Sequence, residues 1–339
     1  PCSIGLPALG TLHEGARTAI EVCMGVKPGE HVFIVTDIFT RKIGEALRKA
    51  AEKASPGNVR LVLLEDFGER PLTSLPKPIE ESIQWANVTL YAARSIRGEL
   101  GMRMPLIKLA KQYARHGHMP SVTEQLMEEG MCADYSRISE LTRTLHKAVA
   151  RAKTARVTSP AGSDLRVEFN PQWRWKVSDG LFNKRGEWGN LPDGELSTAA
   201  QKANGRIIAE EFGDWFSDKY GILERSPVRI DIKDSRADLD RIVCSNSTLR
   251  EELVEYLKTD ENSNRLGEFS IGTNIFLGKL VGNLLQDEKF PSIHVAFGDP
   301  YPDETGADWV SRTHVDAIMR NATLWVDGNK LMENGRHLV

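Results

Sequence analysis

The stretch "EHVFIVTDIFTRKIGEALRKAAEKASPGNVRLVLLED", residues 30–66, determines the fold expected for the first half of the chain. Residues 30–37 form a short β-branched run, residues 39–54 carry apolar side chains at helical spacing, and residues 58–66 are strand-like again. The segment "SPGN" supplies a turn before the second strand. A strand, a helix and a strand in this order predict a βαβ unit with two parallel strands.

The segments that follow repeat this alternation. Residues 81–94 are typical of a helix and then a strand, residues 104–117 of another helix, and residues 138–153 of a basic helix that closes the domain. We therefore predict an α/β protein whose N-terminal domain, residues 1–155, contains a parallel sheet flanked by helices. Neither GxGxxG nor GxxxxGK[ST] opens these helices, so nucleotide binding is not indicated and this half is interpreted as scaffold.

The second half of the sequence differs from the first in its expected secondary structure and in its composition. Short strands, Gly-rich turns and clustered Trp residues fill residues 156–339, which we predict to form a C-terminal α+β catalytic domain. Two domains also suit the length, because a chain of 339 residues with 40% hydrophobic content is long enough for two cores.

Composition restricts the partners and the setting. Charged residues make up 27% of the chain and the net charge is -3, without a Lys/Arg block, so no nucleic-acid partner is expected. The longest apolar runs fall short of the roughly 20 residues that cross a bilayer, and no secretion signal is indicated. Cys2, Cys23, Cys132 and Cys244 are far apart and form no CxxC pair, which indicates reduced thiols in a cytoplasmic protein.

Two motifs of the second half each present a glutamate. In "GNLPDGELS" (189–197), Glu195 follows a Pro-Asp-Gly turn, which is either an ordinary turn with an exposed acid or a rigid support for an oxygen ligand. In "NRLGEFSIGTN" (264–274), Glu268 has apolar neighbours. It lies either on the solvent face of a strand or in a buried, paired position, and spacing leaves both possibilities open.

Two further motifs present histidines. In "SIHVAFGDPY" (292–301), His294 lies in an apolar strand, where a lone histidine is more often part of the core. In "SRTHVD" (311–316), His314 and Asp316 point to the same face of a strand, and imidazole with carboxylate suits zinc, manganese, cobalt or iron. This His-x-Asp pattern also occurs by chance.

A competing pair of histidines lies in the first half. His116 and His118 in "RHGHMP" have the same spacing, but no nearby carboxylate completes a ligand set. We predict a capping or loop role for them.

In this order, the four motifs of the second half resemble the metal-dependent aminopeptidase family of aminopeptidase T, aminopeptidase S and PepS. The resemblance covers about residues 155–327, and the seven-residue step from His294 to Tyr301 and the His-x-Asp pair both fit it. It implies one or two divalent ions (Zn, Co, Mn or Fe), a homodimer, and Tyr301 beside the metal. The ligands that it implies are Glu195, Glu268, His294, His314 and Asp316.

The sequence departs from this family at one functional position. Peptidase members often carry a second acid immediately before the first ligand glutamate, where this chain has Gly194. The general base therefore stays open, with Asp193 or Tyr301 as stand-ins. Relatives of the family also include a one-iron 2,5-dihydroxypyridine dioxygenase and a hydrolase that removes an amino group from a nitroaromatic acid.

The resemblance implies a metal-dependent hydrolase, most simply an aminopeptidase that acts on small peptides or other small molecules through a metal-activated water. Glu195 and Tyr301 are the candidate catalytic residues, and Glu268 is the candidate bridging carboxylate. Tyr301 would donate a hydrogen bond to the oxyanion. A non-catalytic metal-binding protein is the least attractive alternative, because a complete ligand set lies beside a candidate acid-base tyrosine.

The main alternative is a mononuclear enzyme that acts on an aromatic or N-heterocyclic ring. His294, His314 and Asp316 would form a 2-His-1-carboxylate triad on ferrous iron, although such a site does not need Glu195 or Glu268. The residues that could line an aromatic pocket are Trp173, Trp175, Trp188, Trp215 and Trp309.

Overall fold

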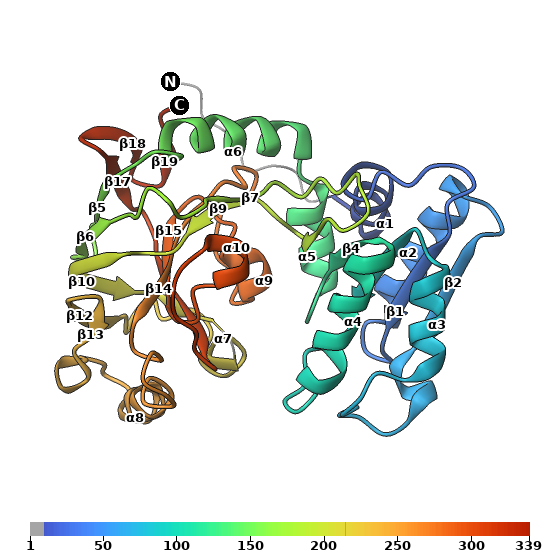
Figure 1. Ribbon diagram of the computed structural model, residues 1–339, viewed down its shortest axis with the longest axis horizontal. Helices are drawn as coiled ribbons and strands as arrows, with labels where there is room; N and C mark the ends of the chain where they lie inside the picture. Colours follow the sequence, from blue (N-terminus) through green and yellow to red (C-terminus); the bar gives the residue numbers. More distant parts are fainter. Residues whose placement is uncertain (1–9, 214) are drawn as a thin grey trace. The chain divides into compact units, whose positions relative to one another are not determined.

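The computed structural model describes residues 10–213 and 215–339. The chain forms two compact units, shown in Figure 1, that interleave in sequence. Unit 1 contains the chain up to Ser139 together with Asp179–Asp193, and unit 2 contains Glu140–Ser178 and Gly194–Val339. The sequence predicts one domain boundary, near residue 155. In the structure, the chain passes from one unit to the other three times.

A five-stranded parallel sheet forms the centre of unit 1, in the order β2-β1-β3-β4-β8. Its strands are β1 (Val32–Thr36), β2 (Val59–Leu63), β3 (Val88–Ala92), β4 (Arg115–His118) and β8 (Trp188–Asn190). Every residue of β1 and β3 is buried, as expected for a parallel sheet that is covered on both faces. The parallel-sheet prediction is confirmed.

Helices connect these strands. They are α1 (Leu12–Arg17), η1 (Thr18–Cys23), α2 (Arg41–Ala54), η2 (Leu64–Phe67), α3 (Lys77–Trp85), α4 (Leu100–Tyr113), α5 (Glu124–Glu128), η3 (Gly130–Cys132) and the start of α6 (Tyr135–Val149). Helix α2 joins β1 to β2 and buries Ile43, Leu47 and Ala51, which share one helical face. The predicted βαβ unit is therefore present.

The helix predicted at residues 104–117 is wrong at its end. Helix α4 stops at Tyr113 because Ala114 is extended, and the next four residues form the buried strand β4. His116 and His118 consequently lie inside a sheet, in place of the predicted cap or loop. Thr89 Oγ1 lies 2.8 Å from His116 Nδ1, and His116 Nε2 lies 3.2 Å from His118 Nδ1. Burial lowers the pKa of His116 to about 3 and that of His118 well below its ordinary value.

These two histidines make stability depend on acidity. Because their pKa values are depressed in the folded chain, the unfolded chain binds more protons below about pH 6.5. Stability should therefore fall as the pH falls from about 6.5 toward 3, by up to about 1.4 kcal/mol per pH unit for each histidine. Urea denaturation at a series of pH values measures the slope. His116→Asn should flatten it and the exposed control His13→Asn should not, whereas equal slopes for all three proteins would contradict the assignment.

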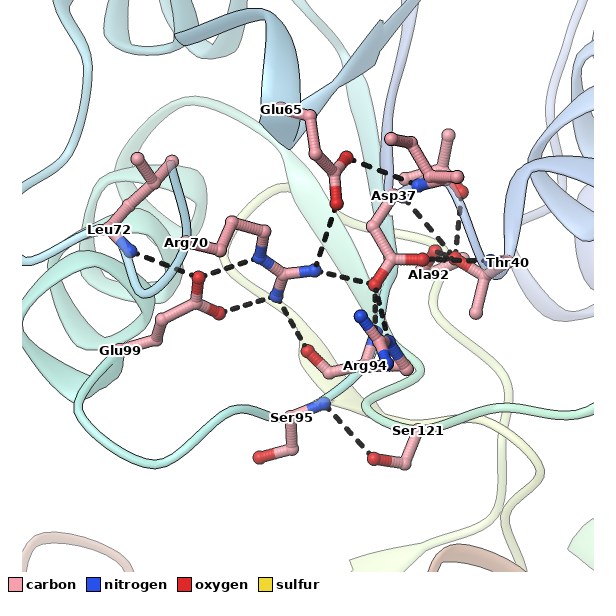
Figure 2. A network of polar contacts seen from close by, with 12 residues as sticks. Asp37, Thr40, Glu65, Arg70, Leu72, Ala92, Arg94, Ser95, Glu99 and Ser121 are labelled. Carbon is pink, nitrogen blue, oxygen red and sulfur yellow. Dashed lines mark hydrogen bonds and ion pairs between the residues drawn. The ribbon is translucent and has the colours of Figure 1, made fainter. Parts of the chain in front are cut away.

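An ion-pair network fills the carboxyl edge of the unit 1 sheet, as Figure 2 shows. The strand order reverses direction between β1 and β3, the position where open α/β sheets usually bind ligands. Asp37 directly follows β1, and the Arg70 guanidinium lies 2.5 Å from its Oδ2. Arg70 also donates to both carboxylate oxygens of Glu99 and to the carbonyl of Arg94, while the Thr40 hydroxyl donates to Asp37. This saturated network supports the interpretation of unit 1 as scaffold.

Unit 2 contains two antiparallel sheets (Figure 1). The larger sheet has the order β13-β12-β10-β6-β5-β17-β18-β19, and the smaller, here called sheet C, has the order β11-β16-β15-β14-β9-β7. The strands are β5 (Thr154–Thr158), β6 (Asp164–Glu168), β7 (Lys176–Ser178), β9 (Glu195–Thr198), β10 (Lys202–Ala209), β11 (Glu211–Phe212), β12 (Val228–Lys233), β13 (Arg236–Ala237), β14 (Leu266–Gly272), β15 (Ile293–Gly298), β16 (His314–Met319), β17 (Thr323–Val326), β18 (Asn329–Glu333) and β19 (Arg336–His337).

The helices of unit 2 complete an α+β arrangement, as the sequence predicts. They are the remainder of α6, α7 (Trp215–Tyr220), η4 (Leu239–Arg241), α8 (Ser247–Tyr256), α9 (Leu284–Asp287) and α10 (Pro302–Thr305). Leu145 and Val149 of α6 belong to the hydrophobic core of this unit. Their burial explains why most of α6 is grouped with unit 2, although the sequence assigns the helix to the first domain.

Two further expectations concern membranes and thiols. Within the described ranges, no helix combines the length and the apolar character that crossing a membrane requires. Cys23, Cys132 and Cys244 are free thiols. Cys2 lies outside the described residues.

Candidate metal centre

The strand register of sheet C brings the predicted ligands to one face. Glu268 on β14 and Asp316 on β16 both lie opposite Ala296 of β15, two residues from His294 on the same strand. His314 starts β16 opposite Gly298, and Glu195 starts β9 opposite Gly272. Because alternate residues of a strand share a face, all five side chains point to the same side of the sheet.

The imidazole nitrogens and the carboxylate oxygens are close to one another. His294 Nε2 lies 3.6 Å from Glu195 Oε2, 3.7 Å from Glu268 Oε1 and 3.9 Å from Asp316 Oδ1. His314 Nε2 lies 3.6 Å from both Glu268 Oε2 and Asp316 Oδ1. Ligand atoms that surround an ion at 2.0–2.2 Å are roughly 3–3.6 Å apart. These pairs of atoms are therefore at, or slightly above, the spacing of ligand atoms that share one ion.

The environment of the two histidines favours a positive charge. His294 is fully buried, and neither of its ring nitrogens makes a hydrogen bond within the described part of the chain, although buried polar atoms normally have partners. Burial acts to lower the pKa of His294, but Glu268, Asp316 and Glu195 together raise it to about 9. Opposing its burial in the same way, Asp316 and Glu268 raise the pKa of His314 to about 10. A divalent cation fits this donor set.

The "GDPY" turn after β15 positions two side chains. The carbonyl of Asp299 lies 2.9 Å from His314 Nδ1, which directs His314 Nε2 to the carboxylates. Tyr301 has a φ of 51°, uncommon for a non-glycine residue, and its N–H donates to Asp299 Oδ1. The rings of Tyr301 and His314 are 4.6 Å apart. Tyr301 is 45% exposed as a whole residue. Desolvation of its hydroxyl, with the charges of Glu268 and Asp316, raises the pKa of Tyr301 well above its ordinary value, so the hydroxyl stays a donor.

Sequence reasoning missed two charged residues at the site, Glu288 and Lys289. Lys289 is fully buried, and its ammonium lies 2.7 Å from Glu195 Oε1 and 2.6 Å from Glu288 Oε1. Ligand atoms of Glu195, Glu288 and His294 all lie within 4.8 Å of one another. The segment "QDEK" has the composition of an ordinary charged helix end, and its only signal is its position shortly before His294.

Three other residues that the sequence singles out have identified partners or positions outside the cluster. Asp193, one stand-in for the general base, is grouped with unit 1, where its N–H donates to the hydroxyl of Tyr135. Trp188 is a strand residue of unit 1, and Trp175 packs edge-on against Phe269 in the core of unit 2. These two tryptophans are therefore accounted for by packing.

The fold and the site together define the class of protein. The protein is a two-unit α/β protein with a candidate metal centre. One unit contains a parallel sheet, and the other contains sheet C, which carries a cluster of imidazoles and carboxylates suited to a divalent cation.

Two family models match adjacent parts of the chain. The model of the thermophilic metalloproteases (M29) matches residues 241–337, which include Glu268, His294, His314 and Asp316. The model of 2,5-dihydroxypyridine 5,6-dioxygenase matches residues 122–239, which include Glu195. The resemblance inferred from the four motifs is thus confirmed. The chain is similar both to the metalloprotease model and to the dioxygenase model. Among curated proteins, none is similar enough to count as a match.

Two solved structures share the fold over almost the whole chain. AmpT from Thermus thermophilus has a TM-score of 0.73 at 19% identity, and the match covers 97% of this chain and 99% of AmpT. The 2,5-dihydroxypyridine dioxygenase from Pseudomonas putida KT2440 has a TM-score of 0.70 at 15% identity, with 97% of each chain covered.

Proposed function

We propose that this protein is a metal-dependent hydrolase that removes N-terminal residues from small peptides. One observation carries the proposal: two imidazoles and three carboxylates meet on one buried face of sheet C. The ligands that we assign are Glu195, Glu268, His294, His314 and Asp316. A divalent ion bound there would supply a Lewis acid and a water of lowered pKa.

The side chains around the cluster have distinct roles in this proposal. The protonated hydroxyl of Tyr301 donates to the oxyanion that forms when water attacks the peptide carbonyl, an effect worth roughly 3–4 kcal/mol. Glu195 accepts a proton from the attacking water, and Lys289 orients its carboxylate. The surplus of carboxylates favours a substrate whose free α-amino group carries a positive charge.

A second candidate function is ring cleavage of an aromatic or N-heterocyclic substrate. It is favoured by the match of residues 122–239 to the dioxygenase model and by the presence of His294, His314 and Asp316 as a facial triad. Against it, Glu195 and Glu268 lie within 3.6–3.7 Å of the imidazole nitrogens, where a one-iron oxygenase needs no further carboxylates.

The proposal includes a cytoplasmic setting, which the scattered cysteines indicate, and a homodimer, which the resemblance implies. Light scattering coupled to size-exclusion chromatography measures the assembly directly, and a monomer would contradict the second part.

A paired assay tests the choice of reaction. Metal-stripped protein is reloaded with Zn²⁺, Co²⁺, Mn²⁺ or Fe²⁺ and offered short peptides, their N-acetylated forms, and 2,5-dihydroxypyridine in an oxygen electrode. We expect release of N-terminal residues from the free peptides and not from the acetylated ones. Oxygen uptake with the iron-loaded protein, without peptide cleavage, would favour the second candidate.

A further inference from the structure

We propose that the ammonium of Lys289 takes the place of a second metal ion, so that the centre holds one divalent ion per chain. The inference rests on the proposed function, because it concerns the same cluster. Its starting point is the position of Lys289 Nζ between two carboxylates, 2.7 Å from Glu195 Oε1 and 2.6 Å from Glu288 Oε1.

The donor atoms of the cluster fall into two groups that share His294. One group contains Glu268, His314 and Asp316, and the other contains Glu195 and Glu288. His294 Nε2 lies within 3.6–3.9 Å of Glu195, Glu268 and Asp316. Because a ring nitrogen has one lone pair, it can ligate one ion only. We assign the histidine nitrogen to the first group, because His294 Nε2 and His314 Nε2 both face Glu268 and Asp316. The second group, although close enough to His294 to share it, is then left with its two carboxylates.

Those two carboxylates already bind a cation. A divalent ion on Glu195 and Glu288 would share both with the Lys289 ammonium, and like charges so close repel strongly in a buried site. Lys289 cannot easily withdraw. Its side chain is fully buried. Its backbone is also held in place, because the backbone N–H of Lys289 donates to the carbonyl of Gln286 and its backbone carbonyl accepts the N–H of Asn274.

Lys289 therefore acts as a built-in cation and a positioning residue. Buried lysines are rare unless they are paired, and this pairing keeps Glu195 Oε1 occupied while Glu195 Oε2 faces His294. In this one-ion centre, Glu268, His294, His314 and Asp316 hold the ion. Glu195, which the proposed function counts among the ligands, here lies beside the ion as the base.

The experiment counts metal ions in purified full-length protein. Metal-stripped protein is dialysed against Mn²⁺, bound metal per chain is determined by elemental analysis, and the electron paramagnetic resonance spectrum distinguishes isolated from coupled Mn²⁺. We expect one isolated ion per chain in the wild type. Lys289→Ala, which removes the ammonium and opens space, should bind a second ion with a coupled spectrum.

Two controls separate charge from folding. Lys289→Arg keeps the positive charge and should stay at one ion, and Lys279→Ala, at an exposed lysine, should match the wild type. If Lys289→Ala fails to fold, Lys289→Val fills more of the buried space near the backbone, leaves the position of the ammonium empty, and should still bind more than one ion per chain.

The outcomes are distinguishable. Two ions in the wild type, or a single ion in the folded neutral variants, would overturn the inference and leave the proposed function standing. No bound ion in the wild type would overturn both.

Discussion

Replacing His294 with glutamine is expected to weaken divalent-metal binding by more than about 100-fold, beyond the losses typical of residues that only support a ligand. The reason is its central position: Nε2 lies within 3.9 Å of Glu195, Glu268 and Asp316. Removing the imidazole takes away a ligand and leaves carboxylates that repel one another. Glutamine keeps much of the volume of this fully buried side chain, so the fold should survive.

Competition with a chromophoric chelator measures this loss. His31→Gln serves as the control, because His31 stacks on Trp85 in unit 1 and is not one of the residues of the cluster. Thermal unfolding of both variants without metal shows whether they remain folded. A folded His294→Gln variant with wild-type metal affinity would remove His294 from the ligand set.

Replacing Arg70 with methionine is expected to lower the free energy of unfolding by about 3–5 kcal/mol, the usual cost of breaking a buried ion pair. Arg70 is 5% exposed, and the carboxylates of Asp37 and Glu99 that it joins are fully buried (Figure 2). Without the guanidinium, the carboxylates of Asp37 and Glu99 would be buried without the cation that joins them. Each carboxylate would then lack its main positive partner.

Urea denaturation measures this effect. Arg48→Met is the matched control, since Arg48 pairs with Glu45 on the surface and should contribute at most about 1 kcal/mol. Adding Asp37→Asn and Glu99→Gln to Arg70→Met should restore part of the loss, because the unpaired charges are then removed. A loss of less than 1 kcal/mol for Arg70→Met would show that the network does not stabilise unit 1.

The predictable parts of the fold are those encoded by local periodicity. The β-branched run at 30–37 and the helical spacing at 39–54 correspond to β1 and α2, whose apolar faces must be buried wherever they lie. Strand β4 was not predictable in this way. Its four residues "RHGH" look polar, and they are buried only because β3 and β8 flank them on either side.

The candidate site shows the same division. The pair His314 and Asp316 is visible in the sequence because strand geometry alone puts residues i and i+2 on one face. Glu288 and Lys289 carry no such local signal, because their relation to Glu195 exists only once the loop after α9 packs beside β9. Which atoms pair across the cluster depends on the register of β9, β14, β15 and β16, which spacing within one strand does not encode.

The central claim, that the cluster activates water for hydrolysis, is tested most directly by the source of the oxygen in the product. Reloaded protein is given a cleavable peptide in ¹⁸O-labelled water under ¹⁶O₂, and then in ordinary water under ¹⁸O₂, and the products are analysed by mass spectrometry. The proposed function predicts one ¹⁸O atom from water in the carboxylate of the released N-terminal residue and none from the gas. Label that enters a product from ¹⁸O₂ would contradict it.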